Sequence, residues 1–262
     1  MVVDFLLFLC YDRRILKREL FMPTYSCSRI AQIKPNPDQF AERVKPIRHL
    51  VVHSFALSVS DMLTCLAQNG ISSHYIIDTD GQIMQLVPED KVAWHAGKSF
   101  WRGESGLNAS SIGIELQNPT LGQTPFPKAQ IEAFSWLARG IIERHRIDPR
   151  LIVTHSDIAP TRKVDVGKAF PWAEVAKDGI GLWCDSADVA PTEDVAQALA
   201  QIGYDISDVD KALLAFERRF MPEVVPTEPD IMQMETHLVE VKPVDTPAVR
   251  RRLAQIAALY SA

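Results

Sequence analysis

The sequence predicts an α/β fold in which helices flank a mixed central β-sheet, with a small helical domain at the C-terminus. Short aliphatic runs that are typical of buried strands alternate with helical segments between residues 47 and 155. The dipeptide Asp80-Gly81 separates two further apolar segments and predicts a β-hairpin, so the sheet is expected to be mixed. After Cys184 the composition changes and helical segments follow.

The N-terminal half contains four expected elements. Residues 27–46 are expected to be irregular, because three prolines interrupt any regular period. Asn69-Gly70 is expected to stop a short helix. The elements are a buried strand over residues 47–52 that ends on His53, the helix over 60–68, and the hairpin strands 75–78 and 83–87.

Two strands and a long helix are expected in the middle of the chain. Residues 112–117 alternate with period two, which puts three aliphatic side chains on one face of a strand and Glu115 on the other. Residues 127–147 carry apolar side chains three or four apart and predict the strongest helix. A strand over 151–154 ends on His155. Functional residues at strand ends indicate a site along the carboxyl edge of the sheet.

The sequence divides into an N-terminal extension, a central domain and a small helical domain. A proline- and acid-rich stretch over 222–247 separates the last expected helix from the two before it. A helical unit of this size is too small to be robust alone. The expected domains are residues 1–26, 27–185 and 190–262, and the expected C-terminal helices are 192–200, 208–220 and 248–259.

Composition excludes several classes of protein. The net charge of −5 argues against a general nucleic-acid binder. Four widely separated cysteines without a Cys-x-x-Cys pair indicate neither a thiolate zinc site nor a disulfide framework. The apolar run Phe5–Cys10 is too short to span a bilayer, and no other segment could cross one. Asp4 before that run and Arg13-Arg14 after it do not fit a secretory signal, which favours the cytoplasm, with the periplasm or cell envelope as the alternative.

Two histidines and a carboxylate predict a catalytic metal site. His53 and His155 both follow aliphatic runs at the ends of strands that are expected to be neighbours. Two imidazoles and one carboxylate form a three-ligand zinc site with an open fourth position. Asp165 and Asp157 are both candidates for the carboxylate, since Asp157 could equally cap the turn after His155. The carboxylate of Glu115 and an ammonium group nearby would supply a proton acceptor and a charge stabiliser, which together indicate a hydrolase.

Other residues are weaker candidates, for contacts with the substrate. His74, Trp94 and His95 lie in segments that could line a groove and touch substrate. Arg102 and Asn108, in a polar loop, are candidates for gripping an anionic peptide, although a solvated loop explains them equally well. The remaining histidines are expected to serve no site: His145 near a helix C-terminus, and His49 and His237 at the surface.

Five stretches resemble the type 2 zinc-dependent N-acetylmuramoyl-L-alanine amidases, a family related to peptidoglycan recognition proteins. The resemblance spans roughly residues 27–185, keeps the motifs in order, and is strongest to the branch with AmpD-like and AmiD-like enzymes. Val166 and Ser54-Phe55 depart from the usual pattern without removing a functional group. The matching stretches are Val51–His53, Ser73–Tyr75, Ala93–Gly97, Ser111–Leu116 and Thr154–Asp165.

The resemblance implies a function and assigns roles. It implies His53, His155 and Asp165 as ligands of one Zn²⁺ and Glu115 with Lys163 as the catalytic pair. The bond cut would be the amide between N-acetylmuramic acid and L-alanine in peptidoglycan or in soluble (anhydro-)muropeptides. Such a chain would take part in cell wall degradation or peptidoglycan recycling.

Two other functions and a role for the C-terminal helices remain open. A non-catalytic peptidoglycan-binding module would keep the fold and lose the chemistry. A serine hydrolase is disfavoured, because no Gly-x-Ser-x-Gly motif occurs. Residues 202–217 resemble the small peptidoglycan-binding modules that are often attached to such amidases, but a helical brace on the central domain is the alternative.

Overall fold

The computed structural model describes residues 29–33, 37–185, 188–226 and 241–261, and it is built around one six-stranded sheet. The strand order is β1-β5-β4-β9-β3-β10, and every pair is parallel except the β4–β5 hairpin. The mixed sheet predicted from the sequence is therefore confirmed. The strands are β1 Ile30–Gln32, β3 His49–Phe55, β4 Tyr75–Ile77, β5 Ile83–Gln85, β9 Ser111–Gln117 and β10 Ile152–Thr154.

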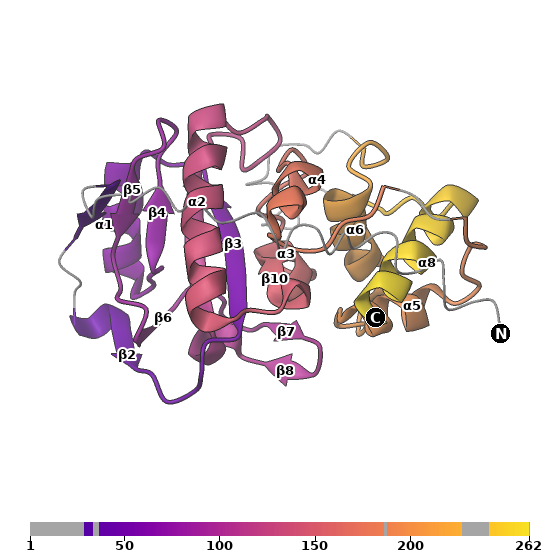
Figure 1. Ribbon diagram of the computed structural model, residues 1–262, viewed down its shortest axis with the longest axis horizontal. Helices are drawn as coiled ribbons and strands as arrows, with labels where there is room; N and C mark the ends of the chain where they lie inside the picture. Colours follow the sequence, from indigo (N-terminus) through magenta and orange to yellow (C-terminus); the bar gives the residue numbers. More distant parts are fainter. Residues whose placement is uncertain (1–28, 34–36, 186–187, 227–240, 262) are drawn as a thin grey trace.

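Two small antiparallel pairs and seven helices complete the described part of the chain (Figure 1). The pairs are β2 Phe40–Glu42 with β6 Lys91–Ala93, and β7 Phe100–Trp101 with β8 Glu104–Ser105. The α-helices are α1 Val59–Asn69, α2 Lys128–His145, α3 His155–Ile158, α4 Trp172–Val175, α5 Val195–Ile202, α6 Val209–Phe220 and α8 Pro247–Ser261. Short 3₁₀ turns lie at Pro37–Gln39, Leu107–Ser110, Pro149–Leu151 and Ala176–Asp178.

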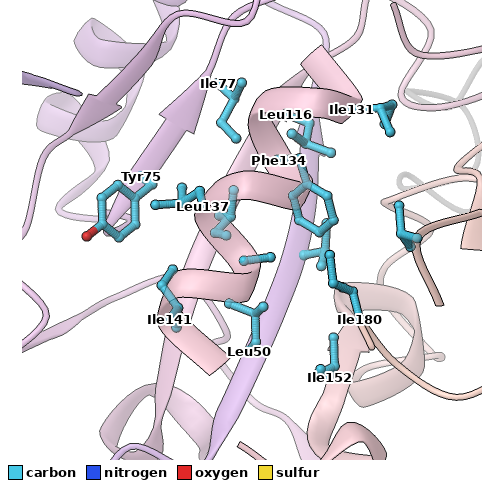
Figure 2. Close-up of a cluster of buried hydrophobic side chains, with 14 of the residues drawn as sticks. Leu50, Tyr75, Ile77, Leu116, Ile131, Phe134, Leu137, Ile141, Ile152 and Ile180 are labelled. Atoms are coloured by element: carbon cyan, nitrogen blue, oxygen red, sulfur yellow. The ribbon is translucent and has the colours of Figure 1, made fainter. Parts of the chain in front are cut away.

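Helices cover both faces of the sheet, because side chains alternate along each strand. Helix α2 packs its apolar stripe on one face, and Figure 2 shows Phe134 and Leu137 of that stripe against Leu50, Ile77 and Leu116 of the strands. Burial of each such side chain stabilises the fold by about 1.5–3 kcal/mol. Helix α1 packs on other strand residues in a separate cluster that includes Phe55, Met62, Leu66 and Ile76.

The C-terminal helices share a hydrophobic core with the sheet-bearing part of the chain. Figure 1 shows α5, α6 and α8 beside the β10 edge of the sheet. Leu199, Phe216 and Ile256 from these helices pack in one cluster with Val51 and Val153 from the strands. Asp194 and Asp208 cap α5 and α6 by accepting a hydrogen bond from a backbone N–H. The helices predicted here are confirmed.

The structure differs from the sequence-based expectations near the N-terminus. The segment expected to be irregular contains β1 and β2, which are three residues long and depend on partners far along the chain. The first long strand runs on to Phe55, so His53 lies inside β3 rather than at its end. His49 was expected at the surface, yet it is buried because β3 is central in the sheet. Residues 1–26 and His237 lie outside the described residues.

Among the described residues, no helix combines the length and apolar character needed to cross a membrane.

The hairpin at Asp80-Gly81 and the helix stop at Gly70 follow the sequence-based expectation, and Gly70 adopts the left-handed conformation with φ of 62°. Helix α2 ends at His145, whose Nε2 lies 2.6 Å from a carboxylate oxygen of Glu89.

Glu89 lies at the centre of a polar cluster that gives the fold a pH-dependent contribution to stability. Its carboxylate accepts hydrogen bonds from Tyr75 Oη at 2.8 Å and Arg144 Nη2 at 2.6 Å, besides its contact with His145. Burial by itself raises the pKa of Glu89, but the hydrogen bonds from Arg144, His145 and Tyr75 outweigh it and lower that pKa from 4.5 to about 2. The ionised carboxylate therefore stabilises the fold above about pH 4.5, and this stability is lost as the pH falls toward 2.

We expect Glu89→Gln to lower the free energy of unfolding at pH 7 by about 1–2 kcal/mol, after allowance for solvent screening. The difference from the unsubstituted protein should shrink as the pH falls below about 4.5. Urea denaturation at several pH values measures it. Glu42→Gln is the control, because Glu42 pairs with Lys91 while its side chain is 80% exposed. A difference that stays constant with pH would contradict this account.

Candidate metal centre

Three side chains from distant parts of the chain meet in one buried cluster. His53 Nδ1 lies 3.1 Å from His155 Nδ1, and each of these nitrogens lies 3.4 Å from an oxygen of Asp165. The exposed fractions of the three residues are 1%, 7% and 5%. Two nitrogens bound to one tetrahedral zinc ion at its usual bond length would be about 3.3 Å apart. The arrangement is therefore compatible with a metal site.

Strand pairing and one loop bring these donors together. Because β10 pairs with β3 in parallel, with Thr154 opposite Val52, the next residue of each strand, His155 and His53, lie side by side. Asp165 returns to the cluster through a loop, which is closed where the Ser156 N–H donates to the Asp165 carbonyl at 2.8 Å. The aspartate is thus held at its backbone as well as at its side chain.

The electrostatics of the cluster favour an ionised aspartate beside the two imidazoles. Burial raises the pKa of Asp165, but the charges and hydrogen bonds of His155 and His53 outweigh this effect and hold the pKa well below its usual range. A carboxylate that stays ionised is what a metal ligand requires.

A chain of hydrogen bonds orients His53 from behind. His53 Nε2 lies 2.9 Å from His95 Nδ1, and His95 Nε2 lies 3.1 Å from Ser111 Oγ, which donates to the Leu107 carbonyl at 2.7 Å. Burial first, and then the neighbouring histidines, lower the pKa of His95 well below its usual value, so the ring is neutral. With a proton on Nε2 of both rings, every bond in the chain has one donor, and His53 Nδ1 is left free to bind a metal.

His95 thus lies behind a candidate ligand, although the sequence suggested that it could touch substrate. Gly113 of β9 makes room for it, because a Cβ at Gly113 would lie 2.6 Å from the His95 ring. Asn108 fixes the same segment, since its Oδ1 accepts from the backbone N–H groups of His95 at 3.0 Å and Ala96 at 2.7 Å. Trp94 is half-buried, and its backbone N–H donates to Ser72 Oγ.

Two further candidates have partners within the protein. His74 is fully buried, its Nδ1 accepts from the Gly113 N–H at 3.0 Å, and burial lowers its pKa to about 3. Arg102 donates to the carbonyls of Gln201 and Ile202 at the end of α5. The structure therefore does not bring His74 or Arg102 to the metal centre.

Glu115 lies beside the candidate ligands. It pairs with His53 in the β3–β9 register and points away from the aliphatic face of β9, as the period-two alternation predicts. Burial is the largest cause that raises the pKa of Glu115 to about 7, and the charge of Asp165 adds to it. The charges of His53 and Lys163 act in the opposite direction, so Lys163 lies near enough to interact with Glu115. A carboxyl group with this pKa can both accept and donate a proton near neutrality.

Asp157, the alternative third ligand, has both oxygens engaged elsewhere. Its Oδ2 accepts from the Thr154 N–H at 2.9 Å and from Arg219 Nη1 at 2.6 Å, while its Oδ1 accepts from Tyr204 Oη at 2.7 Å. The capping alternative describes Asp157 correctly, since Thr154 and Asp157 form a capping box on α3. The structure brings Asp165, and not Asp157, to the two histidines.

Sequence reasoning missed several residues that shape the site. Arg162 Nη2 lies 3.3 Å from His155 Nε2, and its side chain donates to the carbonyls of Ala96 and Lys98, which ties two loops together. Arg219 and Tyr204 reach Asp157 from the C-terminal helices. Arg162 lies only seven residues from His155, but its carbonyl acceptor on Ala96 and the partners Arg219 and Tyr204 of Asp157 lie 47 to 66 residues away, so no local pattern could reveal these contacts.

Comparisons with known proteins agree with this site. The family model Amidase_2, described as N-acetylmuramoyl-L-alanine amidase, matches residues 43–168, a range that contains all five candidate catalytic and metal-binding residues. N-acetylmuramoyl-L-alanine amidase AmiD of Escherichia coli (strain K12) is 38% identical over 216 residues, which are 70% of this chain and 78% of that protein. The 1,6-anhydro-N-acetylmuramyl-L-alanine amidase AmpD of the same strain is 42% identical over 109 residues, 41% of this chain and 58% of AmpD.

Solved structures extend the likeness beyond the matched family range. The complex of E. coli AmiD with anhydro-N-acetylmuramic acid-L-Ala-D-γ-Glu-L-Lys has 34% identity and a TM-score of 0.69, covering 84% of this chain and 93% of that one. AmpDh3 from Pseudomonas aeruginosa has 29% identity and a TM-score of 0.70, covering 83% and 94%. The extent of the AmiD match, together with the Amidase_2 match, shows that the chain belongs to the N-acetylmuramoyl-L-alanine amidase family.

Proposed function

We propose that this protein uses one zinc ion to hydrolyse the amide bond between N-acetylmuramic acid and L-alanine in peptidoglycan or anhydro-muropeptides. The observation that carries the proposal is the convergence of His53, His155 and Asp165 beside the Glu115 carboxyl group. Family membership supports it, as does the structure of the relative AmiD in complex with its substrate, an anhydro-muramyl peptide.

Zinc is proposed because the donor set is two imidazole nitrogens and one carboxylate. Such a set leaves a fourth position open, as catalytic zinc sites do. When bound, the ion supplies Lewis acidity, which activates water and polarises a carbonyl group. The protein contributes the tautomer of His53, held through His95 and Ser111, and the ionised state of Asp165.

Glu115 is proposed as the general base and acid. Its carboxylate would accept a proton from the attacking water and deliver it to the departing amine of L-alanine. The pKa of about 7 suits both steps near neutral pH, and burial is its main cause. Lys163, whose charge acts on Glu115, is proposed to stabilise the negative charge that develops on the carbonyl oxygen in the transition state.

We also propose that the chain is organised as an N-terminal extension over residues 1–26, a catalytic domain over 27–185 and a small helical domain over 190–262. The proposed role of the helical domain is to contact peptidoglycan. The order of charges around Phe5–Cys10 supports the cytoplasm as the proposed compartment, and the cell envelope is the alternative. Fractionation of cells that express the full chain tests the compartment.

Product analysis separates hydrolysis from mere recognition. Incubation of the zinc-loaded protein with intact sacculi and, separately, with soluble anhydro-muropeptides should release free stem peptides from at least one substrate. Mass spectrometry identifies these products, and the substrate that reacts faster defines the preferred form. Stoichiometric binding without released peptide would instead favour a non-catalytic module.

We expect Glu115→Gln to reduce turnover by about 10²–10⁴-fold, because the proton acceptor is removed while the metal ligands remain. Zinc content per chain should stay that of the unsubstituted protein, as measured by atomic absorption. Glu217→Gln is a matched control, since Glu217 is also buried with a pKa raised to about 7 but lies in α6. Unchanged turnover in Glu115→Gln would exclude Glu115 as the base.

We expect Asp165→Asn to lower zinc occupancy well below one ion per chain after dialysis, because the only carboxylate in the donor cluster is lost. Asp148→Asn serves as the control, since Asp148 pairs with Arg150 and caps a 3₁₀ turn outside the cluster. Full occupancy in Asp165→Asn would show that another residue provides the third ligand.

A further inference from the structure

The turn that carries His155 is held from outside by side chains of the C-terminal helical unit, α5, α6 and α8. Arg219 of α6 donates from Nη1 to Asp157 Oδ2 at 2.6 Å and from Nη2 to the Ile152 carbonyl at 2.9 Å. One guanidinium thus joins the start of β10 to the first turn of α3. Tyr204, which follows α5, donates to the other oxygen of Asp157 at 2.7 Å.

This junction is buried, so each of its two charges depends on the other for compensation. The side chains of Arg219 and Asp157 are 1% and 0% exposed. The guanidinium also lies 4.0 Å from the centre of the Trp172 ring, which restricts its position further. Removal of one member of such a buried pair leaves an uncompensated charge and strongly disturbs its surroundings.

Two of the three candidate metal ligands depend on the same turn. Thr154 and Asp157 form the capping box of α3, and His155 is the first residue of that helix. The next residue, Ser156, donates its N–H to the carbonyl of Asp165 at 2.8 Å. A shift of α3 would therefore move His155 and Asp165 together, relative to His53 in β3.

We infer that Arg219 is a positioning residue of the metal centre, which acts through Asp157 on His155 and Asp165. The C-terminal helices then help to support the metal centre, whether or not they also contact peptidoglycan. This inference rests on the metal site of the proposed function. Partners that contact metal ligands directly commonly affect metal affinity by about 10–100-fold, and because Arg219 acts one step further out, through Asp157, we expect an effect at the lower end of that range.

Arg252 offers a matched control for the removal of a buried arginine. It lies in α8, donates to the Cys184 carbonyl at 2.6 Å, and its guanidinium lies 4.7 Å from the centre of the Trp183 ring. Arg252 thus resembles Arg219 in burial, carbonyl acceptor and aromatic neighbour, but it donates to Cys184, Phe220 and Gln255, which lie outside α3.

The test compares Arg219→Gln, Arg219→Lys and Arg252→Gln by zinc competition against a chelator, well below their unfolding temperatures. We expect Arg219→Gln to bind zinc about 10-fold more weakly than Arg252→Gln, with Arg219→Lys in between. The visible absorption of the cobalt-substituted protein should change in Arg219→Gln only. In the metal-free protein, amide hydrogen exchange at residues 154–158 should accelerate in the same variant.

A purely structural role would give a different result. Both glutamine variants would then unfold at lower temperature, while zinc affinity and the cobalt spectrum stayed as in the unsubstituted protein; that outcome overturns the inference. If Arg219→Gln does not fold, Tyr204→Phe removes a single hydrogen bond to Asp157 and should weaken zinc binding by a few fold. Unchanged zinc affinity in both Tyr204→Phe and Arg219→Lys overturns the inference as well.

These measurements do not require turnover. A protein that binds zinc as expected but releases no peptide would refute the proposed amidase function and leave the role of Arg219 standing. Conversely, if the protein is an active amidase but its zinc affinity does not change when Arg219 is replaced, only the positioning role is refuted.

Discussion

The pairing of β3 with a parallel neighbour on each side sets the geometry of the site. Its seven residues are all buried, and its register with β9 places His53 opposite Glu115, while its register with β10 brings His155 alongside. A slip of one residue would turn His53 toward the aliphatic layer under α2 and an aliphatic residue toward the site. The core under α2, shown in Figure 2, prevents such a slip. A slipped strand would expose or misplace every side chain that now packs in this core.

Two carboxyl groups in this small volume acquire opposite properties from their surroundings. Asp165 is stabilised as an anion by the histidines that face it, whereas burial is the dominant influence on Glu115 and raises its pKa. One group is thus suited to hold a cation and the other to exchange a proton. Burial and neighbouring charge thus give the two carboxyl groups different tasks, although both lie beside His53.

The C-terminal helical unit is joined to the sheet by apolar and polar contacts that reinforce each other. It shares a core with Val51 and Val153, and Arg219 of α6 forms an almost fully buried ion pair with Asp157 of α3. The contacts of Arg102 with the end of α5 add a second polar link. The helices beside the site are therefore joined to it by both apolar packing and buried hydrogen bonds.

The sequence by itself determined the helices and strands in which buried apolar residues recur at a regular spacing. The stripe of Ile131, Phe134 and Leu137 defines α2, and the alternation of β9 places Glu115 away from the core, because local periodicity records which face is buried. It also singled out His53 and His155. What implied Asp165 was family resemblance, since spacing left Asp157 open.

Only the tertiary structure decided which polar groups meet. Asp157 is excluded from the donor cluster by Arg219 and Tyr204, and His95 is placed behind His53 by space left at Gly113. The three-residue strands β1 and β2 form because a distant strand offers hydrogen bonds, which no local pattern encodes. Apolar periodicity is a property of neighbours in sequence, whereas a hydrogen-bond partner or a shared ion is a property of neighbours in space, and these lie up to about a hundred residues apart here, as His53 and His155 do.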